Sequence, residues 1–76
     1  MTSEQWRTQF ANNLREAMNI SGMRSTDLAF HARLSDSNVS KYLAGTQTPT
    51  ARALVNMSEA LGVSVDDLVC FGEFVD

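Results

Sequence analysis

The side chains best suited to metal binding or covalent catalysis are scarce in this chain. Its 76 residues include one histidine, His31, and one cysteine, Cys70. A structural zinc site usually has four nitrogen or sulfur ligands, which these two residues cannot supply. A catalytic nucleophile needs a neighbouring base and a group that orients the base, and a lone histidine on a helix has neither. We therefore expect no catalytic residue, no metal site and no cofactor, with His31 at the surface and Cys70 buried or half-buried.

A different chemistry, hydrogen bonding by short polar side chains, is concentrated between residues 35 and 41, which read Ser-Asp-Ser-Asn-Val-Ser-Lys. In a helix that begins at Asp36, Ser37 and Lys41 lie four residues apart and share one face. Val39 then points inward, together with Tyr42 or Leu43, and holds the helix on the domain. An apolar inner face with short polar groups near the N-terminus is what a helix needs to contact base edges.

Apolar residues recur at helical spacing in five segments around this polar stretch. Trp6, Phe10 and Leu14, for example, follow one another at intervals of four. The expected helices span residues 3–19, 26–32, 36–44, 51–61 and 65–69. Their expected N-caps are Thr2 or Ser3, then Ser25, Ser35, Thr50 and Ser64. No segment alternates with period two for long enough to form a strand, and a chain this short makes one small domain. The sequence predicts an all-α fold of five helices.

Charge is distributed unevenly along the chain, whose net charge is -3. Residues 1–57 hold all six basic side chains and four acidic ones, a balance of +2. Residues 58–76 hold five acidic side chains and no basic one, a balance of -5. An acidic protein is a poor candidate for nucleic-acid binding, because affinity for phosphates comes mainly from Lys and Arg. The uneven distribution removes much of this objection for the first part and suggests a different partner for the second.

Nothing in the sequence suggests export or a membrane. Met1 is followed by the polar residues Thr2 to Gln5, which is unlike a secretory signal. No apolar run approaches the roughly 20 residues that a spanning helix needs. We expect a cytoplasmic protein with no membrane partner.

Five short motifs occur in an order and spacing typical of one protein family. They are Asp27-Leu28-Ala29, Leu34-Ser35, Val39 to Gly45, Thr48-Pro49 and Ala60 to Leu68. Together they cover about residues 8–69, and the chain resembles the Cro/CI/XRE helix-turn-helix family of phage repressors and bacterial regulators. The resemblance implies a lambda repressor-like domain over residues 1–69 that binds double-stranded DNA as a homodimer. It also implies a transcriptional repressor that reads a palindromic operator by placing residues 36–44 in the major groove.

The resemblance assigns base contacts to three residues of this third helix, Asp36, Ser37 and Lys41. Asn38 stands between them and is a fourth candidate, for contact with a base or a phosphate. Lys41 can donate to guanine O6 and N7, and Asp36 can accept from a cytosine N4 amine, each worth ~1–3 kcal/mol of discrimination. The alternative for Lys41 is a solvated surface lysine. For Asp36 it is a carboxylate that interacts favourably with the helix dipole.

The resemblance also implies contacts to the DNA backbone from the start of the second helix, from the third helix and from the loop after Gly45. The residues concerned are Arg24, Ser25, Ser40, Thr46, Gln47 and Thr48. The loop offers hydroxyl and amide donors where the family often has basic residues; the alternative is a plain linker. Arg33 stands where the family usually has a turn glycine, and a positive φ there would strain a non-glycine residue by about 1 kcal/mol or more.

Residues 70–76 form a short tail after the last expected helix. Phe71, Phe74 and Val75 are candidate dimer contacts, or the two phenylalanines fold back onto Trp6 or Phe30. The tail also belongs to the acidic end of the chain, which suggests a rival function. In that reading the helix-turn-helix fold binds a protein through its acidic C-terminal face, as an antirepressor or antitoxin-like partner.

Overall fold

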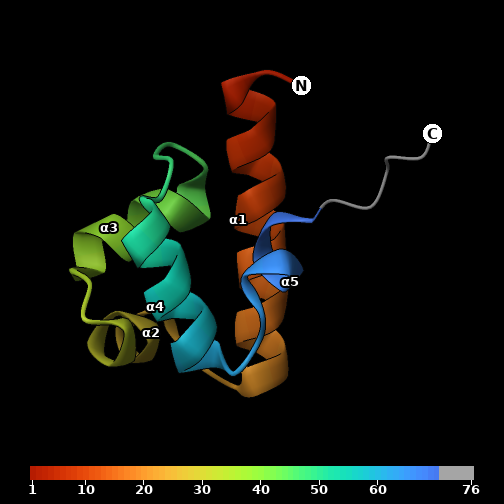
Figure 1. Ribbon diagram of the computed structural model, residues 1–76. Helices are drawn as coiled ribbons and strands as arrows, with labels where there is room; N and C mark the ends of the chain where they lie inside the picture. Colours follow the sequence, from red (N-terminus) through yellow and green to blue (C-terminus); the bar gives the residue numbers. More distant parts are fainter. Residues whose placement is uncertain (71–76) are drawn as a thin grey trace.

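Five helices and no strand make up the part of the chain that the structure describes, residues 1–70 of a computed structural model (Figure 1). They are α1 (Ser3–Ser21), α2 (Ser25–Ala32), α3 (Asp36–Ala44), α4 (Ala51–Leu61) and α5 (Val65–Val69). The prediction of an all-α domain with five helices is confirmed. The first helix runs two residues beyond the expected end at Asn19, because the left-handed stop is at Gly22.

The long helix α1 is the element against which most of the other helices pack (Figure 1). It packs against α3, α4 and α5, while α2 packs against α3 and α4. The side chains at the centre are completely buried and come from all five helices: Phe10, Leu14, Leu28, Val39, Met57 and Leu68. Phe10 stacks on half-buried Trp6 at 5.5 Å between ring centroids and meets Tyr42 edge-on at 6.2 Å. The apolar faces predicted for α1 and α3 therefore meet each other.

Four helices begin with the side-chain caps expected from the sequence, Thr2, Ser35, Thr50 and Ser64. The second helix is different, and the prediction of Ser25 as its cap is wrong. Ser25 is the first helical residue and Arg24 is the N-cap, without a side-chain cap bond. The Asp27 carboxylate accepts from the Arg24 N–H at 3.1 Å. This bond makes Arg24 the N-cap, so the helix begins at Ser25, one residue before the expected start at Thr26.

The turn between α2 and α3 contains the strained residue that the resemblance implied. Arg33 has φ 60° and ψ 42°, the conformation that Gly22, Gly45 and Gly62 adopt after α1, α3 and α4. The N–H of Leu34 donates to the Ala29 carbonyl at 2.9 Å and closes the end of α2. Arg33 thus keeps the glycine geometry with a full side chain.

The surface confirms one sequence-based expectation and corrects another. His31 is exposed, as predicted, whereas Cys70 is also exposed and was expected to be at least half-buried. Cys70 follows α5, which has only five residues and buries Leu68 alone. The expected contacts of Phe71, Phe74 and Val75 lie outside the described residues. None of the helices described is long and apolar enough to span a bilayer.

Candidate nucleic-acid interface

One side of α3 is a strip of exposed polar residues. Asp36, Ser37, Ser40 and Lys41 are exposed, and Asn38 beside them is half-buried. The other side of the helix is buried through Val39 and Tyr42. At nine residues the helix is about 13 Å long, and the major groove of B-DNA is wide enough to admit an α-helix. The four base-contact residues predicted from the sequence are therefore together on one helix, and three of them are exposed.

The first turn of α3 is fixed by its cap. The Ser35 hydroxyl accepts from the Asn38 N–H at 3.0 Å, which places Asp36 and Ser37 at the first two helical positions. Side chains in the first turn of a recognition helix are the ones that reach base edges. The same turn is the positive end of the helix dipole, so it also suits the Asp36 carboxylate. The geometry accommodates both interpretations of Asp36.

The first turn of α2 has amides without a side-chain acceptor. A helix leaves its first N–H groups without intrahelical partners, and of the five described helices α2 is the one without a side-chain cap bond. Ser25 is half-buried there, and Arg24 before it has a side chain that is 83% exposed. Amides at a helix N-terminus bind phosphate readily.

The charge of Arg24 is partly balanced by Asp27. The Arg24 Nε lies 3.5 Å from the Asp27 carboxylate. The hydrogen bond from the Arg24 amide, followed by the nearby guanidinium charge, lowers the pKa of Asp27 below its ordinary value. Arg24 therefore brings less net positive charge to the start of α2 than its side chain alone suggests.

The loop after α3 is held partly by one of its own predicted contact residues. The N–H of Thr46 donates to the Lys41 carbonyl at 3.0 Å, and its hydroxyl donates to the same oxygen at 3.2 Å. Thr46 and Thr48 are exposed, while Gln47 is half-buried. A phosphate contact from the Thr46 hydroxyl would compete with its bond to Lys41, so Thr48 is the loop hydroxyl more readily available.

Two arginines of α1 hold the C-terminal end of α3, a role that the sequence did not reveal. Arg15 Nη2 donates to the Leu43 carbonyl at 2.8 Å, and Arg7 Nε donates to the Gly45 carbonyl at 3.2 Å. The last carbonyls of a helix have no intrahelical partner, and these bonds supply one. In the sequence, each arginine directly follows an apolar residue of the inward face of α1, Trp6 or Leu14. Such positions lie at the edge of that face, next to a packed neighbour, and this pattern could have indicated the contacts.

Among residues 1–70, no three His, Cys, Asp or Glu side chains come close enough together to hold a metal ion. An open groove of about 660 Å³ is lined by residues of α2 and α4, including His31, Arg33, Arg52 and Glu59. Its lining is mostly polar and lies beside the helix-turn-helix.

Comparison with known proteins agrees with this geometry. The sequence model of a helix-turn-helix domain family matches residues 9–69. The restriction-modification controller protein C.AhdI from Aeromonas hydrophila is similar in structure, with a TM-score of 0.78 and 24% sequence identity over 82% of this chain and 94% of that chain. At this identity the likeness shows the fold. No curated protein sequence gives a significant match.

The family match covers α2, the turn at Arg33 and α3, together with most of α1 and all of α4 and α5. It includes every motif on which the resemblance was based, and the helices are arranged as the resemblance implies. The chain therefore belongs to the helix-turn-helix domain family, and its fold agrees with the Cro/CI/XRE resemblance of its motifs.

Proposed function

We propose that this protein is a sequence-specific DNA-binding transcriptional regulator of the cytoplasm, acting as a repressor. Residues 1–69 form the DNA-binding domain and residues 70–76 a separate tail. The observation that carries the proposal is the exposed strip of α3, where Ser37 and Lys41 lie on one face of a helix anchored by Val39 and Tyr42. An exposed strip of short polar side chains on a firmly packed helix is suited to reading bases.

Contacts to the DNA backbone would flank this helix. Uncapped amides at the start of α2, with Ser25 and Arg24, lie on one side of the helix-turn-helix, and Ser40 with the loop of Thr46, Gln47 and Thr48 supplies the other. Amide and hydroxyl donors bind phosphate without adding positive charge. This arrangement supports DNA binding by a chain whose net charge is -3.

Selection of bound duplexes from a randomised pool at low salt tests the proposal directly. We expect retention of related sequences, and affinity that falls steeply as salt rises. Lys41→Ala should then weaken binding by about 1–3 kcal/mol on the selected site and much less on unrelated duplexes. Ser40→Ala, which removes a proposed backbone contact at the neighbouring position, should instead weaken binding to the selected site and to unrelated duplexes about equally. If no duplex is retained at any salt concentration, the proposed function is wrong.

A symmetric dimer is part of this proposal. Two copies would place their α3 helices about 34 Å apart, which requires a palindromic operator. The candidate dimer contacts Phe71, Phe74 and Val75 lie outside the described residues, so the support is the size and family of the domain. Sedimentation of the full chain should show a dimer, and the selected duplexes should have two-fold symmetry. A persistent monomer that selects single half-sites would contradict it.

A second candidate function, protein binding through the acidic end, is favoured by the surface between α1 and α5. A groove of about 320 Å³ lies there, lined by Ile20 and Val63 and rimmed by the carboxylates of Glu16 and Asp67. Ile20 is 80% exposed. Recovery of one specific protein from nuclease-treated extract, lost when Glu73 and Asp76 are replaced by Gln and Asn, would support this function over DNA binding.

A further inference from the structure

The first helix begins well before the segment that matches the family. The match starts at residue 9, whereas α1 starts at Ser3. These extra residues are firmly helical. The Thr2 hydroxyl accepts from the Gln5 N–H at 3.0 Å, while the Gln5 side chain accepts from the Thr2 N–H at 2.8 Å. Trp6 then stacks on Phe10 with an angle of 13° between the ring planes. This α1 extension, residues 3–8, continues the helix on the N-terminal side of the segment that the family model matches.

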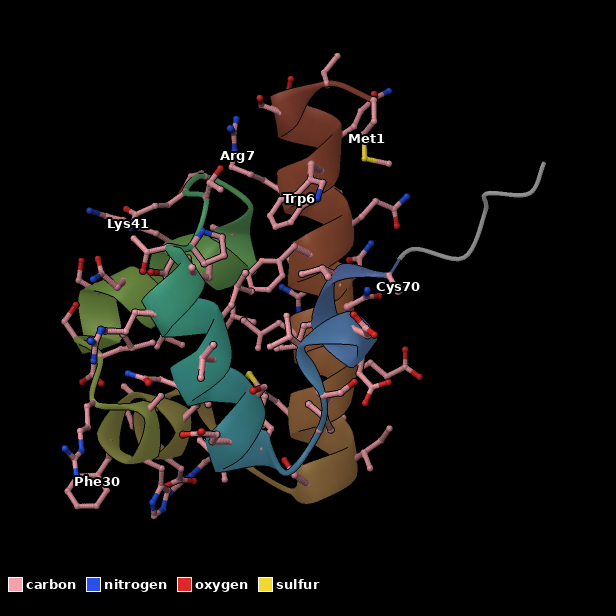
Figure 2. All side chains as sticks on the ribbon, viewed as in Figure 1. Met1, Trp6, Arg7, Phe30, Lys41 and Cys70 are labelled. Atoms are coloured by element: carbon pink, nitrogen blue, oxygen red, sulfur yellow. The ribbon has the colours of Figure 1, made fainter. Side chains whose placement is uncertain are left out.

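The α1 extension lies against the end of α3 and the beginning of the loop after it. Arg7 Nε donates to the Gly45 carbonyl at 3.2 Å. The backbones also approach closely, since a Cβ at Gly45 would lie 3.7 Å from Thr8 Oγ1 and 3.8 Å from the Arg7 carbonyl oxygen. In Figure 2 the Arg7 guanidinium lies beside this loop and points away from the core, at the same end of the molecule as Lys41. Arg7 is thus part of the surface formed by α3 and its loop.

The loop itself lacks a basic residue. Residues 46–50 read Thr-Gln-Thr-Pro-Thr, so phosphate contacts there would rely on neutral donors. A guanidinium has five N–H donors in a planar fork that suits phosphate, and the bond to Gly45 uses one of them. That bond also limits the rotation of a long side chain, which reduces the entropy lost when the remaining donors bind. Arg7 therefore has remaining N–H donors, a position beside the loop and a side chain of restricted rotation, which together suit a contact with an anion.

We infer that Arg7 is a DNA phosphate contact, delivered by the α1 extension to the loop after α3, where it supplies the positive charge that the loop lacks. The inference rests on the proposed DNA-binding function. It adds a contact from a segment outside the family match. The phosphate in question flanks the bases read by Lys41, so Arg7 strengthens binding without changing the preferred sequence.

The experiment is a titration of the full chain with a selected duplex and with an unrelated duplex, at several salt concentrations between 50 and 200 mM. Each phosphate contact contributes about 0.9 to the slope of log affinity against log salt. Arg7→Gln should reduce that slope by about 0.9 on both duplexes. The wild type should then lose about 3.5-fold more affinity than the variant over this range. Arg7→Lys, which keeps the charge, should retain most of the slope.

Arg15→Gln is the matched control, because Arg15 lies on the same helix and also bonds a carbonyl at the end of α3. It should leave the slope unchanged while lowering thermal stability. If Arg7→Gln lowers stability and affinity but leaves the slope at its wild-type value, Arg7 only positions α3 and the inference is wrong. The inference also fails if both variants reduce the slope equally, since the effect would then follow net charge. Absence of any duplex binding by the wild type would instead overturn the proposed function.

Discussion

Arg33 carries the most unfavourable backbone conformation of the described residues. It is the one non-glycine residue with positive φ in residues 1–70, and it sits in the turn that sets the angle between α2 and α3. A left-handed residue with a Cβ costs about 1–2 kcal/mol relative to the right-handed form, and glycine does not bear this cost. The turn is therefore held by its surroundings, the bond from Leu34 to Ala29 and the packing of both helices.

Replacing Arg33 by glycine should stabilise the domain. We expect Arg33→Gly to raise the free energy of unfolding by about 0.5–1 kcal/mol, after allowing for the greater freedom of glycine in the unfolded chain. For a domain of this size that corresponds to roughly 2–8 °C in Tm. Gly22→Ala is the opposite control: φ is +73° there and no atom lies within 4 Å of an added Cβ, so only backbone strain is introduced. A lower Tm for Arg33→Gly would mean that the arginine makes a compensating contact in the groove between α2 and α4.

Asp27 gives the domain a defined dependence on pH. The hydrogen bond from the Arg24 amide is the main reason why the pKa of Asp27 lies below its ordinary value of 3.8, and the Arg24 guanidinium adds to it. A carboxyl whose pKa is lower in the folded state stabilises that state above its unfolded pKa. The stabilisation is lost as pH falls through the folded pKa.

Asp27→Asn should therefore be less stable than the wild type at pH 6, with a difference that shrinks below about pH 3.8. Asparagine keeps an oxygen that can accept from the Arg24 amide, so the comparison isolates the charge. Urea midpoints at pH 6, 4 and 3 measure the effect. A difference that stays constant over this range would contradict the assignment.

At the level of helices, side chains from one helix cap the C-terminus of another. Arg7 and Arg15 of α1 bond the end of α3, Asn56 of α4 bonds the Ala32 carbonyl at 3.1 Å, and Asn13 of α1 bonds the end of α5. Short helices are marginal alone, and α5 has only five residues. These bonds and the buried contacts, rather than intrinsic propensity, keep the short helices in place.

Asn13→Ala should loosen α5 specifically. The Asn13 amide donates to the carbonyls of Leu68 and Cys70 at 3.1 and 3.2 Å. Its removal leaves both without this partner, and we expect a loss of about 1 kcal/mol with faster amide exchange in α5. The neighbouring exposed Asn12, replaced by alanine, should change little. Unchanged exchange rates in α5 for Asn13→Ala would show that the burial of Leu68 alone holds the helix.

Features within one helix were predictable from the sequence, whereas contacts between helices were not. Helix positions, four of the five N-caps and the inward faces of α1 and α3 were predictable, because they depend on residues within one turn of each other. The caps from Arg7, Arg15, Asn13 and Asn56 were not, because they join residues 24 to 57 positions apart. The start of α2 was predicted one residue too late. The Asp27 carboxylate accepts from the Arg24 amide, so Arg24 and not Ser25 is the N-cap. Clustering of the candidate base contacts followed from helical spacing alone.

Charge is distributed unevenly over the molecule as a whole. Its described part measures 37 × 22 × 20 Å. In Figure 1, α3 lies to the left of α1, whereas α5 lies in front of α1. Salt at 0.1 M screens exposed charges over about 10 Å, so the carboxylates of α5, which packs on α1 and α4, should act only weakly at the α3 strip. The net charge of -3 consequently says little about the potential that DNA would meet at α3.

Removing one negative charge should change the affinity for DNA when the charge lies on α3, and much less when it lies on α5. Asp36→Asn removes an exposed carboxylate from the α3 strip, and Asp66→Asn removes one from α5. We expect the first to increase affinity for unrelated duplexes several-fold at 0.1 M salt, and the second to change it by less than about twofold. Fluorescence anisotropy with a labelled random duplex measures both. Equal effects would mean that the total charge, not its location, governs binding.

Cys70 has a practical consequence for such measurements. It is the one cysteine of the sequence, it is exposed, and it lies on the α5 side, away from Lys41 (Figure 2). A maleimide dye would therefore attach at a single position without substitution of any residue and without crowding the α3 strip. Mixing donor-labelled and acceptor-labelled protein turns Cys70 into a spectroscopic ruler. Energy transfer between two copies would then report how far apart their α5 ends lie, both free and on an operator.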